Sequence, residues 1–171
     1  MIVMVYGLPG TGKSYFSRRL APELDAVYLN TDIVRKEMGI QGQYDEKSKQ
    51  RVYDRLLQQM TDHVSKKKNV ILDGTFHKKS ARDPFIRRSK EMEVDLFLIE
   101  IKAGDRTVRR RMQTEREYSE ADYKVYQQIK YSFEPVERNH LSLQSDLQGV
   151  DEMIAETKQY LHEQRTDRKT C

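Results

Sequence analysis

The sequence predicts a three-layer α/β domain in which helices cover both faces of a five-stranded parallel sheet. Apolar runs alternate with helical patterns from one end of the chain to the other. Strands that alternate with helices at this spacing form parallel sheets. A length of 171 residues suits a single domain. We therefore expect one domain over residues 1–164, followed by a polar C-terminal tail over residues 165–171.

Short apolar runs predict the five strands, at residues 1–6, 26–29, 70–72, 94–101 and 140–144. Helical patterns fill the intervals, at residues 13–20, 32–38, 46–67, 80–92, 104–116, 119–132 and 150–164. The helix over 46–67 has a clear periodicity, because Val52, Leu56, Met60 and Val64 recur every four residues. It ends in three lysines, which favour a helix C-terminus.

Composition limits the classes of protein that this chain can belong to. Charged residues make up 34% and hydrophobic residues 37%, which is far from a disordered composition. A net charge of +4 allows an anionic partner without requiring one. The only cysteine, Cys171, excludes an intramolecular disulfide and a cysteine metal cluster. No apolar run approaches the 18 residues of a membrane span and no signal peptide is recognisable, so we expect a cytoplasmic protein.

A phosphate-binding motif follows the first predicted strand and begins the first predicted helix. It fits G-x-x-x-x-G-K-[ST] and consists of Gly7, Leu8, Pro9, Gly10, Thr11, Gly12, Lys13 and Ser14. Its glycines let successive backbone N–H groups point at phosphate oxygens, and the helix N-terminus adds positive dipole character. We expect this loop to bind ATP, Lys13 to bridge the β- and γ-phosphates, and the Ser14 hydroxyl to ligate Mg²⁺.

A second candidate metal ligand, Asp73, ends the predicted strand over residues 70–72. A carboxylate at the carboxyl end of a strand can hold a metal ion through water. The alternative is an aspartate that only serves the turn before Gly74. Many ATPases place a water-activating glutamate at the position of Gly74, so the glycine favours transfer to a hydroxyl group over hydrolysis.

Asp32 and Arg35 form a D-x-x-R pair after the second predicted strand. The spacing places both side chains on one face of a helix. A carboxylate beside the phosphate loop can accept the proton of an attacking hydroxyl group, which makes Asp32 the candidate general base. Arg35 can bind a phosphate or carboxylate of the acceptor. The alternative is that Asp32 caps the helix and pairs with Arg35.

Basic residues gather in two further segments. The first predicts a lid over about residues 104–122, and it contains Arg106, Arg109, Arg110, Arg111 and Arg116. We expect Arg116, and after it Arg111, to stabilise the charge on the γ-phosphate. The second segment contains Lys78, Lys79, Arg82, Arg87, Arg88 and Lys90. It is more typical of a solvated surface than of a nucleic-acid contact.

Four motifs, in this order, resemble those of the small P-loop kinases called zeta-toxin-like or AAA-type predicted kinases. They are the loop Gly7–Ser14 and the segments Asn30–Lys36, Ile71–Phe76 and Arg116–Asp122. The resemblance covers about residues 1–135, and the kinase module of polynucleotide 5′-kinases is a relative. It implies an adenylate-kinase-like P-loop NTPase fold and transfer of the γ-phosphate of ATP, with Mg²⁺, to a hydroxyl group. It also implies that Asp32 is the general base, that Arg35 binds the acceptor's phosphate, and that Arg116 contacts ATP.

The sequence thus predicts an ATP-dependent phosphotransferase whose acceptor is a small metabolite or a polynucleotide 5′-hydroxyl end. The alternative is a nucleotide-dependent switch or binding protein with little or no transferase activity. A guanine-specific switch normally carries D-x-x-G followed by N-K-x-D. The segment 146–149 matches the first of these motifs, but no N-K-x-D follows it. Nothing in the sequence identifies a protein partner.

Overall fold

A single parallel sheet lies at the centre of the molecule. The structure is a computed structural model that describes residues 1–113 and 123–167. Its strands are β1 (Ile2–Tyr6), β2 (Ala26–Asn30), β3 (Asn69–Asp73), β4 (Leu96–Lys102) and β5 (Leu141–Gln144). Within the described ranges they form one five-stranded sheet in the order β2-β3-β1-β4-β5, with every neighbouring pair parallel. The predicted five-stranded parallel sheet is confirmed.

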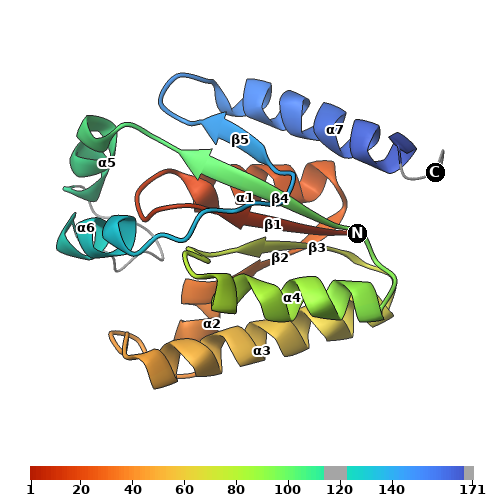
Figure 1. Ribbon diagram of the computed structural model, residues 1–171, viewed down its shortest axis with the longest axis horizontal. Helices are drawn as coiled ribbons and strands as arrows, with labels where there is room; N and C mark the ends of the chain where they lie inside the picture. Colours follow the sequence, from red (N-terminus) through yellow and green to blue (C-terminus); the bar gives the residue numbers. More distant parts are fainter. Residues whose placement is uncertain (114–122, 168–171) are drawn as a thin grey trace.

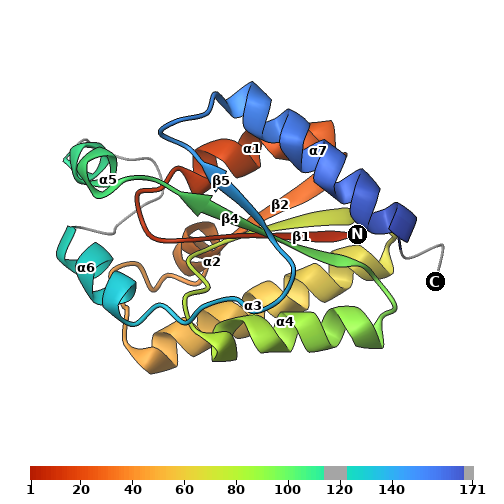
Figure 2. The ribbon, with the colours of Figure 1, turned by 45° about the horizontal axis from the view of Figure 1, so that its top comes forward.

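Helices cover both faces of this sheet (Figure 1). On one face lie α1 (Lys13–Glu23) and α7 (Val150–Asp167), and on the other lie α3 (Glu46–Ser65) and α4 (Lys79–Glu91), as the turned view of Figure 2 also shows. The short helix α2 (Thr31–Glu37) follows β2 directly. The three-layer arrangement is therefore confirmed. Helix α7 extends to Asp167, three residues into the segment 165–171 that we expected to be a polar tail.

Strand β1 explains why its sequence is apolar without alternation. Ile2, Met4 and Tyr6 lie in the core beneath α3 and α4, whereas Val3 and Val5 lie in the core beneath α1 and α7. A central parallel strand is covered on both faces, so each of its side chains must be apolar. The periodicity of α3 is confirmed in the same way, because Val52, Leu56, Met60 and Val64 are all buried.

Two further helices lie beyond the carboxyl ends of the strands, on the left of Figure 1. They are α5 (Asp105–Met112) and α6 (Tyr123–Tyr131), and α5 ends four residues before the predicted boundary at 116. Asp105, the first residue of α5, accepts hydrogen bonds from two side chains of α6, the hydroxyl of Tyr126 at 2.5 Å and the ammonium of Lys130 at 2.7 Å. These contacts hold the start of α5 against α6.

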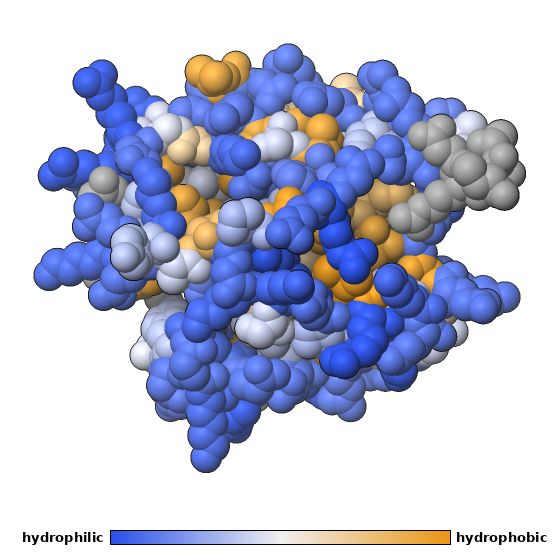
Figure 3. All heavy atoms as spheres, in the orientation of Figure 1, coloured by the Kyte–Doolittle hydropathy of each residue, from blue (hydrophilic) through white to orange (hydrophobic). Residues whose placement is uncertain are grey.

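The strand order reverses at β1, whose neighbours β3 and β4 come later in the chain. Open parallel sheets bind ligands in the crevice that forms at such a reversal, outside the carboxyl ends of the strands. The face shown in Figure 3 is mostly hydrophilic, and apolar side chains reach it in a few separate areas. No helix within the described part of the chain is long and apolar enough to cross a membrane.

Candidate active site

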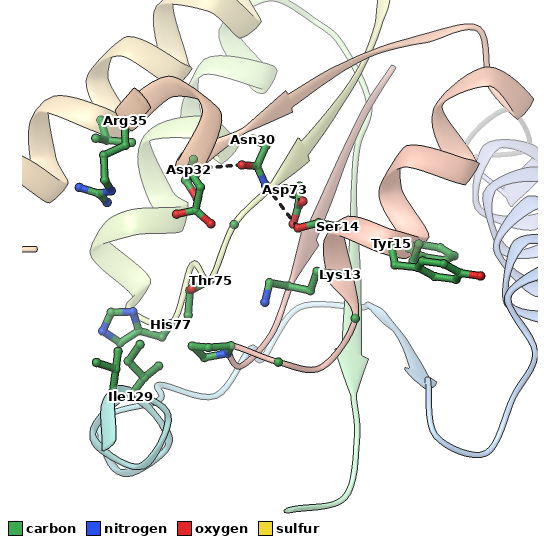
Figure 4. Close-up of a pocket in the computed structure, with 18 of the residues that line it drawn as sticks. Lys13, Ser14, Tyr15, Asn30, Asp32, Arg35, Asp73, Thr75, His77 and Ile129 are labelled. Atoms are coloured by element: carbon green, nitrogen blue, oxygen red, sulfur yellow. Dashed lines mark hydrogen bonds between the residues drawn. The ribbon is translucent and has the colours of Figure 1, made fainter. Parts of the chain in front are cut away.

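A cavity of about 820 Å³ lies at the carboxyl ends of the strands. Its walls come from the loop between β1 and α1, the ends of β2 and β3, helices α2 and α6, and the segment between β5 and α7. Figure 4 shows a close-up of this cavity with the labelled side chains around it. A volume of this size is typical of small-molecule sites. Residues of α3 and Arg111 of α5 also line the cavity, so the fold brings distant parts of the sequence to one concave surface.

Two glycines of the phosphate loop are required by the backbone. Gly12 is the N-cap of α1 and has a left-handed φ of 97°, which other residues rarely adopt. Gly7 also has a positive φ, and a Cβ atom there would lie 2.4 Å from the carbonyl oxygen of Ile101 on the neighbouring strand β4. No side chain caps α1, so the N–H groups of its first turn face the loop. This is the arrangement that binds phosphate.

Lys13 lies over this loop. The residue is 8% exposed, and its ammonium group donates a hydrogen bond to the carbonyl oxygen of Leu8 at 2.8 Å. The hydroxyl of Thr11 donates to the same carbonyl at 2.9 Å. The loop therefore holds the lysine ammonium at its own centre, where the phosphates of a nucleotide would lie. Its expected contact with the β- and γ-phosphates stays a prediction.

Asp73 is fully buried at the carboxyl end of β3, and its two oxygens have different surroundings. Oδ2 accepts hydrogen bonds from the hydroxyl of Tyr28 at 2.6 Å and from the side-chain amide of Asn30 at 2.7 Å. Oδ1 has no hydrogen-bond partner among the described residues. Burial, and then the neighbouring Asp73 carboxylate, raise the pKa of Tyr28 well above its usual range, so its hydroxyl remains a donor at neutral pH.

These residues fit the expected Mg²⁺ site. A buried carboxylate oxygen without a donor needs a partner such as water or an ion. The hydroxyl of Ser14 lies close by, with its oxygen 3.5 Å from the side-chain nitrogen of Asn30. Magnesium usually binds through one or two protein oxygens together with water and substrate phosphates. Ser14 and Asp73 would hold the ion in this way.

The residue after Asp73 has no space for a side chain. A Cβ atom at Gly74 would lie 2.7 Å from Cγ2 of Thr31 and 3.0 Å from a ring carbon of Phe76. Thr31 at the start of α2 therefore leaves no room for a Cβ atom at this position. The preference for transfer over hydrolysis stays a prediction.

Asp32 lines the cavity, and Figure 4 shows its carboxylate turned toward the side of Lys13 and Thr75. The N-cap of α2 is Asn30, whose side-chain oxygen accepts hydrogen bonds from the backbone N–H groups of Asp32 at 2.8 Å and Ile33 at 3.0 Å. The alternative in which Asp32 caps this helix is therefore wrong. Its expected role as general base stays a prediction.

Arg35 lies on the same wall of the cavity and is only 6% exposed. Its Nη1 donates to the backbone carbonyl of Gln43 at 2.7 Å, and its guanidinium carbon lies 4.5 Å from the ring centre of Tyr44. Its Nε is buried and has no hydrogen-bond partner within residues 1–113 and 123–167. An anionic group of a ligand would supply that partner.

The two lid arginines have different outcomes. Arg116 lies outside the described residues. Arg111 lies at the end of α5, where Nη1 donates to the carbonyl of Thr11 at 3.1 Å and to the hydroxyl of Ser145 at 2.9 Å, while Nη2 donates to the carbonyl of Ser145 at 3.0 Å. Burial lowers the pKa of Arg111. The side chain thus ties the phosphate loop to the segment after β5, and its expected contact with the γ-phosphate stays a prediction.

Sequence reasoning missed His77, which lines the cavity in the loop between β3 and α4. The imidazole is 9% exposed, and its Nδ1 has no partner in the part of the chain that the structure describes. Burial first, and then the charges of Lys49 and Lys78, lower the pKa of His77 below its usual range. The ring is therefore neutral near pH 7, and Figure 4 places it beside Ile129. The histidines lack metal-ligand spacing, so no sequence signal singled it out.

The loop that carries His77 is fixed by Arg82, for which the sequence predicted a solvated surface. That prediction is wrong for this residue, because Arg82 is only 3% exposed. Its Nη1 donates to the carbonyl of Phe76 at 2.7 Å and its Nη2 to the carbonyl of Glu134 at 3.0 Å. The backbone N–H of Glu134 in turn donates to the carbonyl of His77 at 2.8 Å. This wall of the cavity is therefore held in place by buried hydrogen bonds.

Comparisons with known proteins agree with this architecture. A family model described as an AAA domain matches residues 2–136. Three solved structures share the fold over 94% or 95% of this chain. A sugar kinase from a Janibacter species has 16% sequence identity, 94% of its own chain covered and a TM-score of 0.74. The APS kinase of Mycobacterium tuberculosis, solved with AMPPNP and APS, has 16% sequence identity, 96% of its own chain covered and a TM-score of 0.72. A gluconokinase from Sinorhizobium meliloti has 14% sequence identity, 95% of its own chain covered and a TM-score of 0.68.

The family match spans the phosphate loop, α2, Asp73 and the loop that carries His77. The strand order β2-β3-β1-β4-β5 is that of P-loop proteins of the adenylate kinase type. With most of its length matched, the chain belongs to the AAA domain family and is a P-loop protein with an adenylate-kinase-like sheet.

Proposed function

We propose that this protein is a kinase that transfers the γ-phosphate of ATP to a hydroxyl group of a small acceptor carrying an anionic group. One observation carries the proposal. Asp32 and Arg35 of α2 line the same cavity as Lys13 and the phosphate loop. A nucleotide phosphate on the loop would therefore face a carboxylate and a buried cation across one enclosed space.

Each residue has a chemical role in this reaction. The loop N–H groups and Lys13 bind the β- and γ-phosphates and orient the γ-phosphorus. The acceptor oxygen forms a bond to that phosphorus, the bond to the bridging oxygen of ADP breaks, and Asp32 accepts the proton of the hydroxyl group. Mg²⁺, when held by Ser14 and Asp73, would neutralise charge on the phosphate oxygens.

Charge at the acceptor end of the cavity supports an anionic acceptor. Nε of Arg35 is buried without a partner among the described residues, and Lys49 and Lys78 line the same cavity. Glu46 pairs with Lys49 at 3.0 Å and with Lys78 at 3.5 Å at the surface. Lys49 and Lys78 thus share the exposed carboxylate of Glu46, and the buried Arg35 takes part in neither of these two ion pairs.

The choice of a small acceptor is supported by the names of the structural neighbours. They are a sugar kinase, an APS kinase and a gluconokinase. Their identities of 14–16% make this a likeness of fold, so the acceptor itself needs an experiment. A polynucleotide 5′-hydroxyl end is the other acceptor class to test, because the D-x-x-R pair resembles that of polynucleotide 5′-kinases.

The experiment uses γ-labelled ATP and Mg²⁺ with four acceptors, namely D-gluconate, a set of free sugars, adenosine 5′-phosphosulfate and a 5′-hydroxyl oligonucleotide. Wild-type protein is compared with Asp32→Asn, and Asp83→Asn on the exposed face of α4 serves as the matched control. We expect label on an anionic small molecule, and a loss of about 10²–10⁴-fold in the rate for Asp32→Asn with ATP affinity retained.

Each outcome has a definite meaning. Label on the oligonucleotide alone would replace the small acceptor with a nucleic-acid end. Equal rates for wild type and Asp32→Asn would remove the general base from the proposal. ATP binding without transfer to any of the four acceptors would favour a nucleotide-dependent binding protein.

A further inference from the structure

We propose that Asn30 is a positioning residue that fixes the metal-binding carboxylate and the start of the acceptor-side helix at the same time. The inference rests on the proposed function in one respect, which is that Asp73 serves a metal ion bound with ATP. Asn30 lies in the motif segment Asn30–Lys36, in which the expected functional residues are Asp32 and Arg35.

The position of Asn30 in the sheet makes the double contact possible. It is the last residue of β2, is 3% exposed, and lies directly opposite Asp73 in the register of the parallel strands β2 and β3. Its amide nitrogen donates to Oδ2 of Asp73 at 2.7 Å and lies 3.5 Å from the hydroxyl oxygen of Ser14. Figure 4 shows this amide between Asp32 on one side and Asp73 with Ser14 on the other.

The other end of the same amide caps α2. Its oxygen accepts the N–H groups of Asp32 at 2.8 Å and Ile33 at 3.0 Å, which fixes where the helix begins. Asp32 and Arg35 are carried on that helix, so their places on the cavity wall depend on this cap. One side chain therefore connects the expected metal ligands to the expected general base.

The amide nitrogen of Asn30 helps to fix the orientation of the Asp73 carboxylate. Oδ2 is held by two donors from β2, Asn30 and Tyr28, so the carboxylate cannot rotate without breaking both hydrogen bonds. Oδ1 is then the oxygen left over. It is buried and has no partner among the described residues, and Asp73 is one of the residues that line the cavity. Partners that orient a metal ligand in this way typically change metal affinity by 10–100-fold when they are removed.

Residue chemistry explains why an asparagine stands here. Asparagine, aspartate and serine cap helices about equally well. Aspartate would place a second carboxylate within about 3 Å of Asp73, where like charges repel. Serine accepts from the helix but lacks an amide nitrogen to donate to Oδ2. A serine hydroxyl can donate as well as accept, but it is a single oxygen on a shorter side chain. Of these three caps, only asparagine has its acceptor for α2 and its donor for Asp73 on two separate atoms.

This difference separates the two contacts experimentally. Asn30→Ser keeps an acceptor that can cap α2 and removes the amide nitrogen that donates to Asp73, whereas Asn30→Ala removes both groups. ATP affinity is measured by titration calorimetry in Mg²⁺ and again in EDTA, and stability is measured by thermal unfolding. Asn139→Ser, whose amide pairs with Gln164 on the surface, is the matched control.

In wild type and in the control we expect Mg²⁺ to tighten ATP binding. Asn30→Ser should reduce this Mg²⁺-dependent gain about 10–100-fold, with wild-type ATP affinity in EDTA and a melting temperature near wild type. Asn30→Ala should show the same loss of Mg²⁺ dependence together with a lower melting temperature. Tyr28→Phe should weaken the Mg²⁺ dependence in the same direction, and it is the second variant if Asn30→Ser does not fold.

An Mg²⁺-dependent gain that is unchanged in both Asn30→Ser and Tyr28→Phe would overturn the inference, as would a wild-type protein whose ATP affinity does not respond to Mg²⁺. The readout is binding rather than transfer, so it is separate from the test of the proposed function. A protein that binds ATP with this Mg²⁺ dependence and labels no acceptor would keep the positioning role and lose the kinase proposal.

Discussion

Replacing Gly74 with alanine tests whether the position after Asp73 has room for a side chain. The new methyl group would lie 2.7 Å from Cγ2 of Thr31 and 3.0 Å from the ring of Phe76. Distances below 3.0 Å do not occur between such atoms, so Thr31 must shift. Either the Thr31 side chain rotates away from its present position or the start of α2, which carries Asp32, moves with it.

The expected loss of stability follows from two opposing effects. Overpacking of a tightly packed site costs about 1–3 kcal/mol. Exchanging glycine for alanine where φ is ordinary stabilises by about 0.4–1 kcal/mol, because the unfolded chain loses freedom. The net loss for Gly74→Ala is therefore about 1 kcal/mol, which lowers the melting temperature of a chain of this size by about 2–4 °C.

A second substitution checks that the clash with Thr31 is the cause. Thr31→Ser removes Cγ2, so the Gly74→Ala and Thr31→Ser double variant should recover about 1 kcal/mol relative to the sum of the single changes. Urea unfolding followed by far-UV circular dichroism measures this, since the chain contains no tryptophan. A Gly74→Ala variant as stable as wild type, or single effects that simply add, would refute the reasoning.

Three further predictions concern the walls of the cavity. Lys13→Ala should abolish turnover while the protein stays folded, and measurable transfer from γ-labelled ATP would contradict the role of the lysine. Arg111→Lys should lose about 1–2 kcal/mol of stability, because an ammonium group cannot reproduce three hydrogen bonds of a planar guanidinium. Urea unfolding beside the exposed control Arg110→Lys checks this, and equal stability of the two variants would contradict it. Because the pKa of His77 is lowered on folding, the unfolded chain binds a proton more readily, and stability falls as the pH drops below about 6.5. His77→Asn should therefore lose less stability than wild type between pH 7 and pH 5. An equal loss of unfolding free energy in the two proteins over this range would contradict the prediction.

The parts of the fold that depend on local pattern were predictable from the sequence. The apolar run at residues 1–6 predicted the strand that the structure has at Ile2–Tyr6, and the four-residue repeat of α3 identified its buried face. The candidate site was predictable for a related reason. Lys13, Asp32 and Asp73 each follow or end a strand, and the carboxyl ends of parallel strands meet at one edge of the sheet.

Contacts between distant parts of the chain were not predictable in the same way. Tyr28 and Asp73 are 45 residues apart, and they meet because β2 pairs with β3 rather than with β1. Arg111 meets Thr11 across 100 residues. Nothing local distinguished Arg82 from the exposed basic residues around it, because its burial depends on the segment around Glu134. Asn30 carried a usable signal, since an asparagine directly before a helix favours capping.

The contacts of Asp105 with Tyr126 and Lys130 have a consequence for how this protein can vary. They join the two ends of a segment of about twenty residues, and a chain closed at its ends tolerates changes in length well, because doubling the length of such a loop costs only about 0.6 kcal/mol. The segment is nevertheless tied to the rest of the site, because Arg111 within it donates hydrogen bonds to Thr11 of the phosphate loop and to Ser145 after β5. A change in the length of this segment is therefore tolerated only where it keeps Asp105, Arg111 and Tyr126 in place.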